Sequence, residues 1–73
     1  MFLAEITNGS ECKIVGVYLN DKMKKRLSEL GVKKGAKVKV IKKSVKKAPM
    51  IFLVKNTFLS VREEDAKKIE VIK

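Results

Sequence analysis

The sequence predicts a small, mainly β domain: a five-stranded barrel with one helix after the first strand and a short helical turn before the last. The chain has 73 residues, no internal repeat and no linker-like stretch, so we expect a single domain over residues 1–73. Sustained helical periodicity occurs once, whereas short β-rich runs between tight turn signals occupy most of the rest. A barrel is favoured because closing a small sheet hides the edges of its strands.

The predicted helix begins at Asp21, which can cap the first turn, as can Asn20 before it. Three apolar residues recur at i, i+4 and i+7 and therefore share one face: Met23, Leu27 and Leu30. Gly31 stands where a helix commonly ends in a left-handed residue. We therefore expect a helix with one core-facing side that stops at Gly31.

Strands are expected on both sides of this helix. The run from Cys12 to Leu19 is rich in β-branched residues, and its alternation changes phase across Gly16, which predicts a β-bulge. Cys12 is expected to be a small buried side chain. After the helix, Gly35 supplies the positive φ of a tight turn, and residues 36–40 alternate apolar residues with lysine, as in a half-buried strand.

A hairpin is predicted in the second half of the chain. Two β-rich runs, residues 50–54 and 57–61, flank Lys55 and Asn56, and Asn56 is the residue expected at positive φ. With Phe52 and its alternate neighbours directed inward, three large apolar residues face outward on the opposite side: Ile51, Leu53 and Phe58. Either the N-terminal segment at residues 2–3 or the basic loop at residues 42–48 folds over this face, or the face is a contact surface.

The chain ends with a helical turn and a strand. Acidic residues precede lysines over residues 62–68, an order that the helix dipole favours. Residues 69–72 are then expected to form the fifth strand.

The composition is strongly basic, with 18 Lys and Arg against eight Asp and Glu and a formal net charge of +10. Such a charge attracts nucleic acid, an anionic membrane surface or an acidic protein face. Histidine is absent and Cys12 is the one cysteine, so we expect no metal site, no cofactor and no catalytic residues. The longest apolar run is too short to insert into a membrane, which makes the cytoplasm the expected location.

Several short motifs follow one another in a fixed order along nearly the whole chain. They are Arg26–Val32 (RLSELGV), the turn glycine Gly35, Pro49-Met50 before the third strand, and Leu59–Arg62 followed by Asp65-Ala66 and Ile69-x-Val71. Together they resemble the ferrous iron transport protein A (FeoA) domain, with Lys34 and Asn56 standing where that family often has proline and glycine. The resemblance implies an SH3-like barrel, no catalysis, and an accessory or regulatory role beside the GTP-dependent ferrous iron permease of bacteria.

The leading hypothesis is therefore a protein-protein interaction module that binds, by resemblance, the cytosolic G domain of a ferrous iron permease. The predicted contact residues are Arg26, Leu27, Ile51, Leu53, Phe58 and Arg62, and the predicted structural turn residues are Gly16, Gly31, Gly35 and Asn56. Self-association into a homo-oligomer is kept as a further alternative. The alternative is a basic β-barrel that binds nucleic acid, or a metalloregulator-type domain, although the few aromatic residues provide no evident platform for stacking bases.

Overall fold

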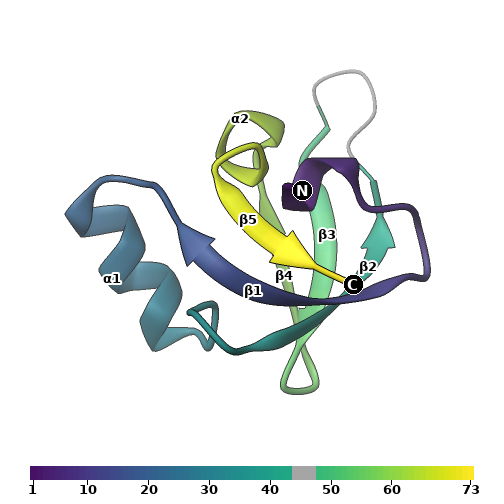
Figure 1. Ribbon diagram of the computed structural model, residues 1–73, viewed down its shortest axis with the longest axis horizontal. Helices are drawn as coiled ribbons and strands as arrows, with labels where there is room; N and C mark the ends of the chain where they lie inside the picture. Colours follow the sequence, from purple (N-terminus) through teal and green to yellow (C-terminus); the bar gives the residue numbers. More distant parts are fainter. Residues whose placement is uncertain (44–47) are drawn as a thin grey trace.

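The computed structural model describes residues 1–43 and 48–73. Its centre is a five-stranded antiparallel sheet in the order β4-β3-β2-β1-β5, which curves around the core (Figure 1). In chain order the elements are the 3-10 helix η1 (Leu3–Glu5), β1 (Glu11–Val17), α1 (Asp21–Glu29), β2 (Lys37–Lys42), β3 (Met50–Val54), β4 (Thr57–Val61), α2 (Glu63–Ala66) and β5 (Ile69–Ile72). The prediction of five strands, with a helix after the first and a helical turn before the last, is confirmed.

Helix α1 begins after Asn20, whose side-chain Oδ1 accepts a hydrogen bond from the Met23 N–H at 2.8 Å. Of the two predicted caps, Asn20 therefore fills the role, and Asp21 is the first helical residue. Leu27 is buried and Met23 is half-buried against the core. Leu30 was expected on the same face but is 46% exposed, because the regular helix ends one residue earlier.

Gly31 ends the helix in the left-handed region, with a φ of +99°. The Val32 N–H donates to the Leu27 carbonyl oxygen at 2.8 Å, and the Gly31 N–H donates to the Ser28 carbonyl oxygen at 3.0 Å. These two bonds form a Schellman motif, which satisfies carbonyl groups that the end of a helix leaves free. Val32 is buried, so the chain enters the core directly after the turn.

Gly16 lies at an irregularity of β1, as the phase change in the sequence predicts. The register of the β1–β5 pair shifts between Ile14 and Gly16, which is the signature of a bulge. Strand β1 ends at Val17, two residues earlier than predicted. Beyond it the Tyr18 N–H donates to the Lys68 carbonyl oxygen at 2.8 Å, which ties the end of β1 to the turn before β5.

Strand β2 is longer than predicted and contains a second bulge. It continues to Lys42, two residues past the predicted end at Val40. The register with β3 shifts between Val40 and Lys42, so Ile41 is the additional residue. Lys42 therefore belongs to the strand and not to the predicted basic loop, of which residues 44–47 lie outside the described part of the chain.

The β3–β4 hairpin has the predicted register. Val54 pairs with Thr57, and Leu53 pairs with Phe58. Both turn residues are left-handed, with φ of +49° for Lys55 and +63° for Asn56. This is the type I′ geometry that matches the twist of the strands, so Lys55 shares the role that the sequence predicted for Asn56 alone.

The core lies on the concave side of the sheet and includes the N-terminal segment. Phe52 is the largest side chain that is fully buried, and Leu3 and Ile6 are also fully buried. Leu59, which pairs with Phe52, is half-buried and packs against this core. Because Phe2 pairs with Glu70 beside β5, the N-terminal segment runs along β5 and does not extend over the hairpin.

The two end strands of the sheet, β4 and β5, do not pair with each other in the described part of the chain. The outer edge of β5 is covered, because Phe2 bridges Glu70 and the Val71 N–H donates to the Met1 carbonyl oxygen at 2.7 Å. The N-terminal segment, and not closure of the sheet as predicted, therefore hides the edge of β5. At β4, no backbone hydrogen bond from the described residues reaches the outer edge.

Candidate functional site

The predicted outer face of the hairpin is open to solvent as far as the described residues show. Phe58 is 66% exposed, and Leu53 and Ile51 are half-buried. Leu53 and Phe58 are direct cross-strand partners, so their side chains lie on the same face, and Ile51 follows Leu53 at the spacing of two that keeps it on that face. These three residues are the hairpin patch.

Strand β2 extends the hairpin patch and supplies part of its basic rim. Lys39 pairs with Leu53, which places a lysine beside the patch. Ile41 is 38% exposed at the bulge opposite Ile51, and Lys42 pairs with Ile51. Ile41 was not among the predicted contact residues, although the break in alternation after Val40 was a signal that could have found it.

The remaining predicted contact residues lie outside the hairpin patch. Leu27 is only 6% exposed and packs in the core, so its side chain supports the fold and offers no surface to a partner. Arg26 is exposed in the last turn of α1. Arg62 is exposed and pairs with Glu64, with 3.7 Å between Arg62 Nη1 and Glu64 Oε1.

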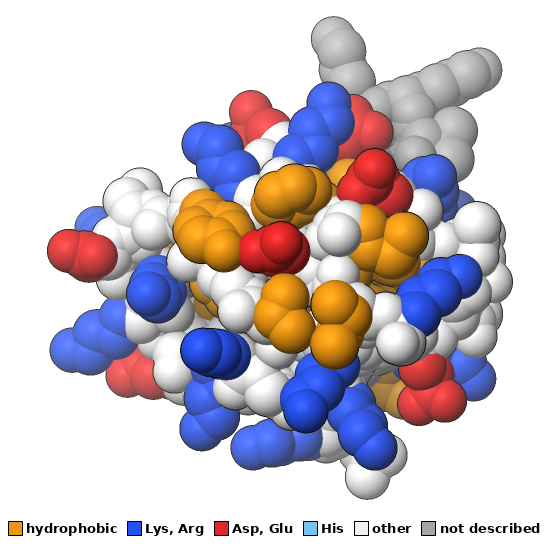
Figure 2. All heavy atoms as spheres, viewed as in Figure 1, with side chains coloured by type: hydrophobic (Ala, Val, Ile, Leu, Met, Phe, Trp, Pro, Cys, Tyr) orange, Lys and Arg blue, Asp and Glu red, His pale blue; other side chains and the backbone are white. Residues whose placement is uncertain are grey.

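A second apolar face, which the sequence reasoning missed, covers the outside of β1 and β5. In Figure 2 hydrophobic side chains gather over these two strands around an acidic side chain, with Lys and Arg side chains at the border. Tyr18 and Ile72 are well exposed, and Phe2 is half-buried beside its bridge partner Glu70. The signal was the final strand, in which Ile69 and Val71 face inward and the residues between and after them face outward.

Tyr18 is held on this second face by one hydrogen bond. Its hydroxyl donates to Glu70 Oε1 at 2.7 Å. This bond, together with the negative charge of Glu70, raises the pKa of Tyr18 above its ordinary value. The ring lies against Gly16, where a Cβ atom would be only 2.7 Å from the Tyr18 hydroxyl oxygen, so the absence of a side chain at Gly16 makes room for it.

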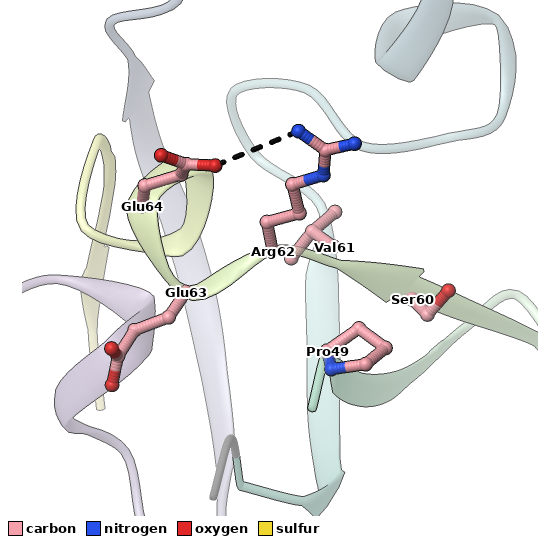
Figure 3. A pocket seen from close by; sticks show the side chains of 6 residues that line it. All are labelled: Pro49, Ser60, Val61, Arg62, Glu63 and Glu64. Carbon is pink, nitrogen blue, oxygen red and sulfur yellow. Dashed lines mark ion pairs between the residues drawn. The ribbon is translucent and has the colours of Figure 1, made fainter. Parts of the chain in front are cut away.

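A pocket opens between the start of β3, the end of β4 and α2 (Figure 3). It is lined by Pro49, Ser60, Val61, Arg62, Glu63 and Glu64. One of its two carboxylates, Glu64, is paired with Arg62, whereas the Glu63 side chain points to the other side of the chain (Figure 3). The two carboxylates are therefore not arranged to hold one ion between them.

The described residues bring together no group of three metal-ligating side chains, whether His, Cys, Asp or Glu. Cys12 is buried, and burial raises the pKa of its thiol, with Lys73 partly opposing this effect. A buried neutral thiol is a poor nucleophile. Within these same residues no helix is long and apolar enough to cross a membrane.

Comparisons with known proteins identify the family. The model of the FeoA domain family matches residues 1–73. The solution structure of the FeoA protein from Chlorobium tepidum is 28% identical with a TM-score of 0.91, over 97% of this chain and 68% of that one. A zinc complex of FeoA from Stenotrophomonas maltophilia, described as a prokaryotic SH3 domain protein, is 30% identical with a TM-score of 0.83, over 99% and 89% of the two chains.

The same fold also occurs in a different setting. A manganese-dependent transcriptional repressor has a TM-score of 0.83 over 94% of this chain and 39% of its own, but at 10% identity the likeness shows the fold alone. A search of curated proteins found no match. The arrangement of strands and helices is that of the SH3-like FeoA proteins, and the family model matches the chain from its first residue to its last. The chain belongs to the FeoA family, which is associated with ferrous iron transport.

Proposed function

We propose that this protein is a cytosolic accessory module of ferrous iron transport that acts by binding the cytosolic G domain of a ferrous iron permease. The contact surface is the hairpin patch. The observation that carries the proposal is that Phe58 is 66% exposed and sits directly beside the apolar Leu53. Contiguous apolar area bordered by charge is the usual mark of a protein contact, since water solvates such a surface poorly.

The charge of the chain favours an acidic partner. The formal net charge is +10, and Lys39 and Lys42 stand next to the hairpin patch through their pairing with β3. These positive charges speed the encounter with an acidic protein surface and disfavour the approach of a basic one. The apolar residues would then provide the affinity of the complex and the lysines its orientation and rate of formation.

A nucleic-acid-binding or metalloregulator-type role is the second candidate, supported by the charge and by the fold shared with the manganese-dependent repressor. Single-strand binders combine basic grooves with aromatic side chains on which successive bases stack. Here Phe52 is buried, and the two well-exposed aromatic residues lie on different faces, Tyr18 outside β1 and Phe58 on the hairpin. The described residues also contain one helix longer than a single turn, whereas a DNA-reading unit of the helix-turn-helix kind needs two.

The proposal is tested by replacing Leu53 and Phe58 singly with serine and measuring affinity for the purified G domain of the permease from the same organism. Burying one such side chain at an interface is worth about 1.5–3 kcal/mol, so Phe58→Ser should weaken binding about ten- to a hundredfold. The melting temperature should change little, because Phe58 is largely exposed.

Ile72→Ser is the matched control, since Ile72 is an exposed aliphatic side chain on β5, outside the hairpin. It should leave the affinity unchanged. Unchanged affinity in folded Leu53→Ser and Phe58→Ser variants would remove the hairpin patch from the interface. Loss of binding in Ile72→Ser would instead assign the contact to the face outside β1 and β5.

A further inference from the structure

A hollow on the outside of the sheet brings together three lysine side chains. It measures about 330 Å³, at the lower end of the range for small-molecule sites, about 300–1,000 Å³. The lysines come from β1, from β2 and from the end of β5, and β1 lies between the two other strands (Figure 1). The lining residues are Glu11, Cys12, Lys13, Lys37, Ile72 and Lys73.

Two of these lysines stand directly opposite each other in the β1–β2 ladder. Lys13 pairs with Lys37, and both side chains are exposed, whereas Cys12 and Ile14 on either side of Lys13 are buried. The Ile14 N–H donates to the Ala36 carbonyl oxygen at 2.8 Å, so the adjacent pair of lysines is of the kind without hydrogen bonds between its backbones. Side chains approach most closely in such pairs, and like charges directly opposite each other destabilise a sheet.

The described residues do not neutralise this pair of charges. Within the part of the chain that the structure describes, no ion pair involves Lys13, Lys37 or Lys73. Glu11 is the one side-chain carboxylate among the lining residues, and it stands opposite Lys39 in the ladder, which offsets its charge. The hollow therefore carries excess positive charge that an anion can relieve.

The rest of the hollow is apolar. Ile72 pairs with Lys13 on the β5 side and is exposed, and the buried Cys12 contributes a side chain without charge. The charge of Lys73 reaches Cys12, because it lowers the pKa of this thiol and so partly opposes the effect of burial. Apolar walls strengthen the attraction between the lysines and an anion, because less water screens the charges.

We infer that this hollow binds a phosphate group with two or more negative charges, held between Lys13 and Lys37 and contacted by Lys73. Phosphate oxygens between the two ammonium groups replace their repulsion with attraction to a shared charge. Lysine suits such a ligand as a mobile point charge that needs no fixed bidentate geometry. The inference does not rest on the proposed function, because no lining residue belongs to the hairpin patch.

The ligand is compact. No aromatic side chain lines the hollow, so a nucleobase has nothing to stack on. The same phosphate chemistry is found in two sources, a soluble molecule with a diphosphate group and a lipid with a phosphate monoester as its headgroup. The experiment has one arm for each source.

The first arm is calorimetry of the full chain with pyrophosphate at a fixed low ionic strength, where we expect saturable one-to-one binding. Lys13→Gln and Lys37→Gln should each weaken binding about two- to fivefold, because each removes one contact between exposed charges. The double variant should weaken it about four- to twenty-fivefold. All variants should fold, because these lysines are exposed, and circular dichroism checks this.

The matched control is the double variant Lys24→Gln, Lys25→Gln, which removes the same charge from exposed positions on α1. It should weaken pyrophosphate binding less than either single variant in the hollow does, because salt screens charges that lie away from the ligand. Equal weakening by the two double variants overturns the site, since the effect would then be one of net charge alone.

The second arm is flotation of the protein with vesicles of phosphatidylcholine, with and without phosphatidic acid. Binding of pyrophosphate that depends on Lys13 and Lys37 supports the soluble source. Binding to phosphatidic acid alone, with the same dependence on the two lysines, supports the lipid source. If neither arm depends on these lysines, the inference is overturned, and it is replaced by a nucleic-acid surface if a single-stranded oligonucleotide alone shows that dependence.

Discussion

Replacing Gly31 tests how the helix is ended, and the structure allows the cost to be estimated. The φ of Gly31 is +99°, a region that residues with a Cβ avoid. A Cβ built there would lie 3.5 Å from Cδ of Lys55 and 3.6 Å from Cγ2 of Val54, which are ordinary van der Waals distances. The destabilisation by alanine should therefore come from the backbone and not from a steric clash.

The expected magnitude is a difference between two terms. A left-handed conformation costs an L-residue about 1–2 kcal/mol, and alanine recovers about 0.4–1 kcal/mol because it restricts the unfolded chain. We therefore expect Gly31→Ala to lower the free energy of unfolding by roughly 1 kcal/mol. Gly31→Val should cost more, because a β-branched side chain has fewer rotamers in the confined space beside Val54.

Urea unfolding followed by circular dichroism measures the effect. With a slope of about 1 kcal/mol per molar urea for a chain of this size, Gly31→Ala should lower the midpoint by about 1 M. Gly35→Ala is the matched control, because Gly35 has a similar φ of +94° and nothing within 4 Å of an added Cβ. Equal losses in the two variants would confirm a backbone origin. Unchanged stability in Gly31→Val would refute the argument that the helix ends by a left-handed glycine.

Two further predictions concern ionisation and metal binding. The hydrogen bond to Glu70 raises the pKa of Tyr18. The stability that this bond contributes is therefore present below about pH 10 and is lost as the pH rises through the raised pKa. Glu70→Ala should return the ultraviolet titration of Tyr18 to its ordinary range, and an unchanged titration would contradict this cause. Anaerobic calorimetry with ferrous iron should show no dissociation constant below about 1 mM, since the chain has no histidine and Cys12 is buried, whereas one-to-one micromolar binding would indicate an iron carrier.

The parts of the fold that the sequence predicted are those fixed by neighbouring residues. The Schellman end of α1 needs a left-handed residue at Gly31 and an apolar residue after it, and both are visible in the sequence. The register of the β3–β4 hairpin follows from a turn of two residues, which leaves one way to pair Val54 with Thr57. Local chemistry is sufficient in both cases, so no knowledge of the rest of the chain was needed.

The parts that were missed depend on residues far apart in the chain. The bond between Tyr18 and Glu70 joins positions 52 residues apart, and it forms only because β1 and β5 pair with a bulge at Gly16. The second bulge, at Ile41, becomes certain only when β2 pairs with β3, because the β2 sequence shows no more than a break in alternation after Val40. Leu27 was assigned to the contact surface, but the α1 face that carries it packs into the core.

The proposed contact at the hairpin patch combines apolar side chains with charge. Its partner would be selected by shape and by the lysines beside the patch, including Lys39. Salt screens the charges of exposed lysines but does not remove apolar area, so the part of the affinity that the lysines contribute should fall as ionic strength rises. Phe58→Ser removes apolar area and should therefore weaken binding to an acidic partner at low and at high ionic strength alike.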